Sequence, residues 1–160
     1  KKNRKGDVMY LKKLMDKYEN NKIELYVDMD GVIADYVVGI PYNFDQKRPL
    51  YDSIKKLEEI SKMSNVSMNI LSITKMNIGK QEKNVWLDKY APFFKKENRN
   101  IISKEENPNI SSENLKLNFL KNLNNNDKII ILIDDDPIIL KTIKKELKNI
   151  VLLKDTVLVD

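Results

Sequence analysis

Apolar and polar positions follow two distinct patterns along the chain. Short, nearly continuous apolar runs are typical of strands buried in a parallel sheet, and they cover residues 24–28, 66–71, 100–103 and 128–133. Apolar residues at a helical spacing mark the segments 7–20, 50–63, 81–92, 111–123 and 138–148. Residues 150–159 predict one or two further short strands. The alternation predicts an α/β fold, in which a Rossmann-like parallel sheet carries helices on both faces and a site at the carboxyl ends of its strands.

The first predicted strand ends in a pair of carboxylates. Asp28 and Asp30 are two residues apart, so they leave the strand end on the same side, and Gly31 allows a sharp turn directly after them. Two like charges held this close repel each other unless a cation or a shared proton lies between them. The pair therefore predicts a Mg²⁺-dependent site, the alternative being a polar turn that merely ends the strand.

A second acidic cluster follows the apolar strand at 128–133. Asp134, Asp135 and Asp136 are adjacent, and three carboxylates after a buried strand are unfavourable without a cation to neutralise them. The chain contains neither cysteine nor histidine, which excludes disulfides, thiolate or imidazole zinc sites and Ser-His-Asp catalysis. Acid and base catalysis is left to Asp, Glu, Lys or Tyr, and this elimination favours a carboxylate enzyme.

These motifs resemble those of a known family. The run Val-Asp-Met-Asp-Gly-Val-Ile-Ala-Asp, which ends at Asp35, resembles the first motif of the haloacid dehalogenase (HAD) superfamily of phosphatases, and most of all its 5′(3′)-deoxyribonucleotidase branch. The resemblance implies that Asp28 is the nucleophile and Asp30 the general acid and base, while Asp35 orients its neighbours through hydrogen bonds. The run Leu-Ile-Asp-Asp-x-Pro resembles the fourth motif and implies that Asp134 and Asp135 complete a Mg²⁺ site with Asp28 and the backbone of Asp30.

The two middle motifs are less specific. The resemblance assigns Ser72, at the end of the second strand, to the transferring phosphoryl group, with Thr74 as the alternative if the strand is longer. Lys83 and Lys116 compete for the role of the lysine that binds phosphate. The single tryptophan, Trp86, is interpreted as a core residue rather than a platform for a base.

The expected domain organisation is a single HAD-like domain over residues 1–160. Residues 1–22 hold a basic tail and a helix, and residues 32–45 hold the flap that relatives place beside the site. Little sequence is left before the second strand for the cap domain of many relatives, so the cap is expected to be minimal or absent. Because the cap usually carries the residues that recognise a base, nucleotide specificity stays open.

The predicted function is Mg²⁺-dependent phosphomonoester hydrolysis through an aspartyl-phosphate, on small phosphorylated substrates such as (deoxy)ribonucleoside monophosphates. Two alternatives stay open: a phosphatase of nucleic-acid ends, which the net charge of +5 would suit, and a catalytically silent partner-binding module. A homodimer is a further expectation. No apolar run approaches the ~20 residues of a membrane helix, which predicts a cytoplasmic protein without a membrane partner.

Overall fold

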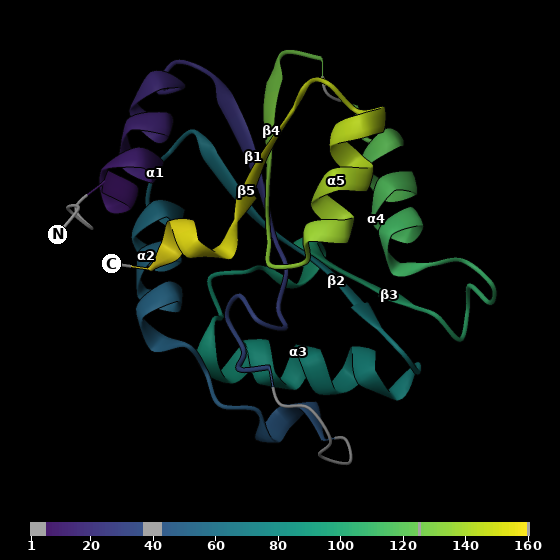
Figure 1. Cartoon of the computed structure of the whole chain (residues 1–160). Coiled ribbons are helices and arrows are strands. Elements are labelled where there is room, and N and C mark those ends of the chain that lie inside the picture. The colour runs from purple at the N-terminus through teal and green to yellow at the C-terminus, as the bar shows by residue number, and fades with distance from the viewer. Residues whose placement is uncertain (1–5, 37–42, 125, 160) are drawn as a thin grey trace, which may run out of the picture.

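A computed structural model describes residues 6–36, 43–124 and 126–159 of the chain (Figure 1). Its five strands are all parallel and form one sheet in the order β3-β2-β1-β4-β5. The strands are β1 (Lys22–Val27), β2 (Val66–Thr74), β3 (Arg99–Ser103), β4 (Lys128–Asp134) and β5 (Ile150–Lys154). The predicted α/β fold with a parallel, Rossmann-like sheet is confirmed.

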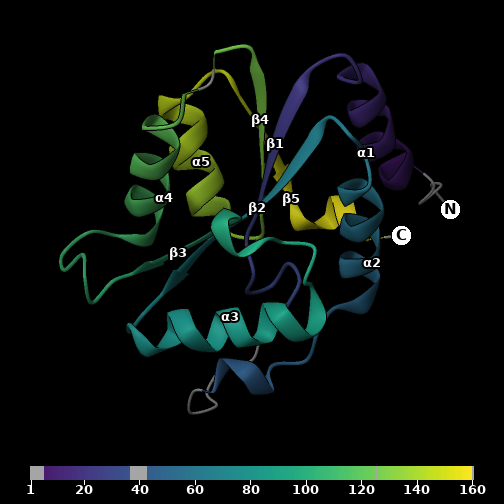
Figure 2. The same cartoon turned by 180° about the vertical axis from the view of Figure 1, so that it is seen from behind.

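Helices cover both faces of this sheet (Figures 1 and 2). The helices are α1 (Gly6–Lys17), α2 (Tyr51–Ser61), α3 (Ile78–Tyr90), α4 (Ser112–Lys121) and α5 (Pro137–Glu146), with short 3-10 helices at Phe44–Gln46, Lys96–Asn98 and Asp155–Leu158. Figure 1 shows α1 and α2 on one side of the sheet, α4 and α5 on the other, and α3 across the end at which β1 finishes. None of the helices described is both long and apolar enough to cross a bilayer.

The strand residues alternate between two cores. In β4, Ile131 and Ile133 are fully buried in the core under α1 and α2, whereas Ile130 and Leu132 are buried in the core under α4 and α5. Successive side chains of a strand point to opposite faces, so a strand covered on both sides is apolar at every position. This burial explains why the central strands appear in the sequence as continuous apolar runs.

The connection order places a crevice at the end of β1. The chain leaves β1 for β2 and β3 on one side and returns to β4 and β5 on the other, so the strand order reverses at β1. Val27 is in register with Ile133 of β4, so these two strands end together, whereas β2 continues past Ile70, its partner for Val27, to Thr74. Open α/β sheets bind their ligands at such a reversal, and Asp28 and Asp134 both lie there.

Several predicted boundaries differ from the structure. The second strand extends to Thr74, and α1 ends at Lys17 rather than near residue 20. Only one strand, β5, forms after residue 150, because residues 155–158 turn into a 3-10 helix that buries Val157 and Leu158 in the core under α1.

The connection between β1 and α2 is short. Its described part contains the turn after Asp28, an isolated bridge from Ala34 to Pro49 and the 3-10 helix at Phe44–Gln46. The described residues of this connection form no separate domain. The predicted tail at residues 1–5 and the middle of the predicted flap, residues 37–42, lie outside the described residues.

Candidate active site

A tight turn positions the carboxylates that follow β1. The amide of Asp28 donates to the carbonyl of Ile133 at 3.0 Å, which ties the end of β1 to β4, and the amides of Ile33 and Ala34 both donate to the carbonyl of Met29. Gly31 completes the turn with φ +77°, in the left-handed region that favours glycine. The turn leaves Asp28 buried and Asp30 partly exposed at the strand end.

Gly31 also allows the loop after β4 to come close. A Cβ atom at this position would lie 2.0 Å from Oδ2 of Asp135. Glycine suits the φ angle of this position, and its lack of a side chain leaves room for the Asp135 carboxylate, which an added Cβ would displace. The consequence is that Asp135 packs directly against the first turn.

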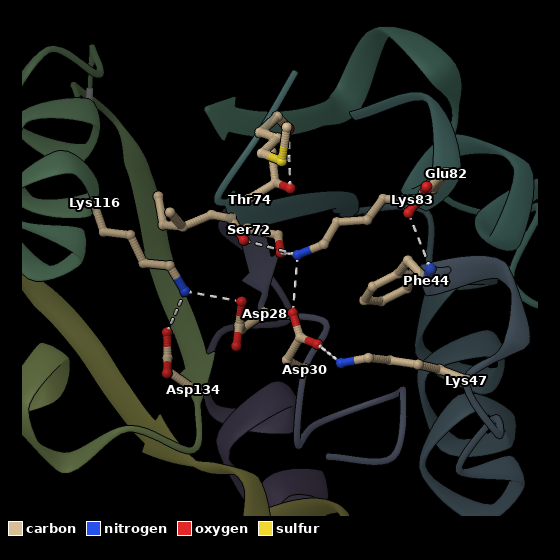
Figure 3. Close-up of polar contacts among 12 residues, drawn as sticks. Asp28, Asp30, Phe44, Lys47, Ser72, Thr74, Glu82, Lys83, Lys116 and Asp134 are labelled. Carbon is tan, nitrogen blue, oxygen red and sulfur yellow. Dashed lines mark hydrogen bonds and ion pairs between the residues drawn. The ribbon is translucent and has the colours of Figure 1, made fainter. Parts of the chain in front are cut away.

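Lys116 of α4 joins the two acidic motifs. Its Nζ lies 2.9 Å from Oδ1 of Asp28 and 2.6 Å from Oδ2 of Asp134, and Lys116 is only 1% exposed (Figure 3). Burial alone would lower the pKa of Lys116, but Asp28 and Asp134 outweigh it and hold the pKa above its usual value. Lys116 is therefore a fixed positive charge between two buried carboxylates.

Asp28, Asp134 and Asp135 form a cluster that suits a divalent cation. Each offers one carboxylate oxygen, and these oxygens lie within 4.8 Å of one another. Burial and the charge of Asp28 raise the pKa of Asp134 to about 6, and burial with the charges of Asp28 and Asp134 raises that of Asp135 to about 6. A set of oxygen ligands with excess negative charge fits a hard cation of the Mg²⁺ or Ca²⁺ type.

Asp136, the third residue of the acidic run, has a structural role. Its side chain accepts a hydrogen bond from the amide of Ile138 at 2.8 Å and caps α5, whose first residue is Pro137. Its own amide donates to Oδ1 of Asp134 at 3.0 Å, which fixes the orientation of that carboxylate. Asp136 is thus a helix cap that also orients Asp134.

Lys83 of α3 organises the other half of the site. It is 3% exposed, and its Nζ donates to Oδ2 of Asp30 at 2.9 Å, to Oγ of Ser72 at 2.7 Å and to the carbonyl of Ile73 at 2.8 Å (Figure 3). Lys83 and Lys116 were expected to compete for one position. The structure brings both to the site, with Lys83 on Asp30 and Lys116 on Asp28.

The hydroxyl groups at the end of β2 differ in exposure. Ser72 is fully buried behind Lys83, and it is not among the described residues that line the cleft, whereas Thr74 is. The Thr74 hydroxyl donates to the carbonyl of Met76 at 3.3 Å, and Gly79 of α3 packs against it. Ser72 therefore reaches the site through Lys83, and its direct contact with a phosphoryl group stays a prediction.

Lys47 is the site residue that the sequence did not reveal. It comes from the segment before α2, and its Nζ forms an ion pair with Oδ1 of Asp30 (Figure 3). Burial alone would raise the pKa of Asp30, but Lys83 and Lys47 outweigh it and hold the pKa below its usual value. In a chain with 29 basic residues, a lysine in a polar loop carries no signal of this role.

Two further predicted residues hold the surroundings of the site. Asp35 pairs with Arg48 at 2.9 Å, and its amide donates to the Arg48 carbonyl, so it fixes the connection before α2 rather than contacting the acidic cluster. Trp86 is buried as predicted, and its Nε1 donates to the carbonyl of Lys47 at 2.9 Å.

The acidic and basic side chains share one open cleft of about 1060 Å³. Its lining includes the carboxylates and lysines described above and three further basic residues, Arg48, Lys75 and Lys104. The cleft thus presents a carboxylate pair, a candidate cation site and several positive charges, which is an arrangement suited to a phosphate-bearing ligand.

Comparisons with known proteins support the fold. No family model matches the sequence, and a search of curated proteins gave no match. The similar solved structures include two of the Pnkp1/Rnl/Hen1 complex, one of which is described as an RNA repair complex. Their TM-scores are 0.66 and 0.63, at 17% and 16% identity over 84% of this chain. The chain spans less than half of either match, 42% and 46%. At this identity the likeness is one of fold.

Proposed function

We propose that this protein is a Mg²⁺-dependent phosphomonoesterase of the HAD type. The observation that supports it is the convergence of four separate segments at the strand-order reversal. Asp28 and Asp30 each contact a buried lysine from a different helix, while Asp134 and Asp135 lie beside Asp28. A polar turn that merely ends β1 would require none of these partners.

In the first half of the reaction, a carboxylate oxygen of Asp28 attacks phosphorus. The bond from phosphorus to the leaving oxygen breaks as the aspartyl-phosphate forms, and Asp30 gives its proton to the leaving alcohol. Lys116 and Lys83, which flank the two carboxylates, offset the negative charge of the phosphoryl group. When bound to Asp28, Asp134, Asp135 and the backbone of Asp30, Mg²⁺ would supply further charge neutralisation and orient the phosphoryl oxygens.

In the second half, Asp30 acts as a base. It takes a proton from a water molecule whose oxygen attacks phosphorus, which releases inorganic phosphate and restores Asp28. Lys83 and Lys47 lower the pKa of Asp30 against the effect of burial, which suits the base role. The proton that Asp30 takes from water in this half is the one it gives to the leaving alcohol of the next turnover.

The substrates we propose are nucleotides, as the resemblance to the deoxyribonucleotidases implies. Phosphorylated nucleic-acid ends are the second candidate, because the described residues include no cap over the cleft and one similar structure is an RNA repair complex. The net charge of +5 would favour the binding of either of these anionic substrates.

The test is phosphate release with and without Mg²⁺ from an aryl phosphate, a panel of nucleoside monophosphates and phosphorylated oligonucleotides. We expect metal-dependent release that Asp28→Asn abolishes. The absence of release from every substrate, by a folded protein that binds Mg²⁺, would contradict the proposal and leave the partner-binding module as the better interpretation.

A further inference from the structure

A short segment before α2 is fixed on α3 beside the site. The indole of Trp86 donates to the carbonyl of Lys47 at 2.9 Å, and the amide of Phe44 donates to Oε2 of Glu82 at 3.0 Å. The ring of Phe44 packs edge-on against Trp86, with 5.9 Å between the centroids. These contacts fix the backbone of Lys47 without involving its ammonium group.

The Lys47 ammonium faces the cleft with unused donors. It pairs with Oδ1 of Asp30 and lies 4.9 Å from the ring centroid of Phe44 and 5.8 Å from that of Tyr36. An ammonium has three N–H donors, and Asp30 is the one hydrogen-bond acceptor it has within the described chain. Its side chain is 17% exposed and lines the cleft, so a ligand oxygen can reach it.

Lys47 lies on the side of the site where the leaving group must be. Under the proposed function, Asp30 protonates the leaving oxygen, whereas Asp28 and Lys116 are on the side of the nucleophile and the cation cluster (Figure 3). Lys83 also contacts Asp30, but all three of its donors are used within the protein. A negative group attached to the leaving alcohol would therefore meet Lys47 first.

We propose that Lys47 is a specificity-determining residue, which binds a second anionic group on the leaving alcohol of the substrate. This inference rests on the proposed function and narrows its substrate class. The preferred substrates are phosphomonoesters that carry a further phosphate, as a nucleoside bisphosphate or a phosphorylated nucleic-acid end does. A nucleoside monophosphate lacks this group and leaves the Lys47 ammonium with Asp30 alone.

The experiment compares matched substrates on the intact protein with Mg²⁺. The substrates are thymidine 5′-monophosphate, thymidine 3′-monophosphate, thymidine 3′,5′-bisphosphate and 5′-phosphorylated dithymidylate. Chromatography separates the products, so that the rates at which the 3′- and 5′-phosphates are lost can be measured separately. Each rate is compared with the rate for the monophosphate that carries the same phosphate alone. The variants are Lys47→Met, Lys47→Arg and Lys55→Met. Lys55→Met is the matched control, because it removes an exposed lysine of α2 that is not among the described residues lining the cleft.

We expect the wild-type kcat/KM to be higher by about tenfold or more when the second phosphate is present, as one charge-assisted hydrogen bond would give. Lys47→Met should bring this ratio close to one, whereas Lys47→Arg and Lys55→Met should retain it. A preference for the bisphosphate would identify free nucleotides as the source of the second anion, and a preference for the dinucleotide would identify strand ends.

Three results would overturn the inference while leaving the proposed function intact. They are a wild-type ratio near one, a ratio that survives in Lys47→Met, and a loss in Lys47→Met that is equal for all substrates. The last would show that Lys47 only positions Asp30. If the wild-type protein hydrolyses none of the four substrates, nucleotide phosphatase activity itself is contradicted, and this inference with it.

Discussion

At the scale of single residues, the site consists of two charge assemblies. Lys116 lies between two buried carboxylates, Asp28 and Asp134, whereas Asp30 lies between two lysines, Lys83 and Lys47. The first assembly keeps a lysine charged and the second keeps a carboxylate charged. The nucleophile and the acid-base group, though only two residues apart, are thereby held in opposite electrostatic surroundings.

The role of Asp30 predicts different effects on the two half-reactions. With p-nitrophenyl phosphate the leaving group needs no proton, so Asp30→Asn should still form the aspartyl-phosphate but hydrolyse it slowly. We expect a burst of nitrophenol close to the enzyme concentration, followed by steady turnover reduced by about 100-fold or more. Rapid-mixing absorbance measurements test this. Asp52→Asn, at an exposed position of α2, is the control, and loss of both burst and turnover in Asp30→Asn would contradict the assignment.

Removal of the lysine from the first assembly should destabilise the protein. Lys116→Met leaves Asp28 and Asp134 buried without their cation, and breaking a buried ion pair in this way reduces the unfolding free energy by roughly 3–5 kcal/mol. Urea denaturation of metal-free protein measures this. Lys121→Met is the matched control on the same helix, because Lys121 is 45% exposed and should change stability by less than about 1 kcal/mol. If the two substitutions lowered the free energy of unfolding equally, the ion pairs of Lys116 would contribute no more to stability than an exposed lysine does.

At the scale of elements, the sequence could predict the strands but not all of their ends. The apolar runs identify β1 and β4 but not that these strands are neighbours. The meeting of Asp28 with Asp134 is what the resemblance implies, and it arises in the structure because β1 pairs directly with β4. The placement of Lys83 and Lys116 depends on the rotation of α3 and α4 against the sheet, which a list of lysines does not contain. Lys47 depends on contacts between Trp86 and a distant loop, for which local sequence holds no signal.

The turn after β1 gives a prediction at this scale. Gly31→Ala places a Cβ 2.0 Å from Oδ2 of Asp135 at a φ of +77°, and the backbone strain alone should reduce the unfolding free energy by about 1–2 kcal/mol. Displacement of Asp135 should also weaken cation binding. Gly31→Asn separates the two effects, because asparagine tolerates this φ but still adds the Cβ. Calorimetric Mg²⁺ titration and urea denaturation are the measurements, and unchanged affinity in both variants would show that Asp135 is not a ligand.

At the scale of the whole molecule, the parallel sheet creates the site and also concentrates charge in it. The strand-order reversal at β1 brings the ends of β1 and β4 together, and so brings three carboxylates within 4.8 Å in the absence of a cation. The fold supplies two cores on either side of the sheet that hold this arrangement in place. The stability of the molecule should therefore depend on whether the charge is neutralised by a proton or by a metal.

This dependence gives a prediction about pH. The pKa values of Asp134 and Asp135 rise from an ordinary 3.8 to about 6 in the folded protein, so the folded state binds these protons more tightly than the unfolded state. Their contribution to stability is therefore present below about pH 4 and is lost as the pH rises through about 6. A bound divalent cation takes the place of the protons and restores the lost stability, because it binds the ionised carboxylates.

We accordingly expect the increase in Tm caused by Mg²⁺, relative to protein in EDTA, to be small at pH 5 and larger at pH 7.5. Asp135→Asn should raise the Tm in EDTA at pH 7.5, because it removes one of three repelling charges, and should reduce the Mg²⁺ effect. Thermal denaturation across this pH range measures both, with Asp16→Asn, at an exposed position of α1, as the control for loss of an acidic charge outside the cluster. An increase in Tm that is independent of pH would show that the cation binds elsewhere, since only ligands that titrate near pH 6 couple its binding to protons in this window.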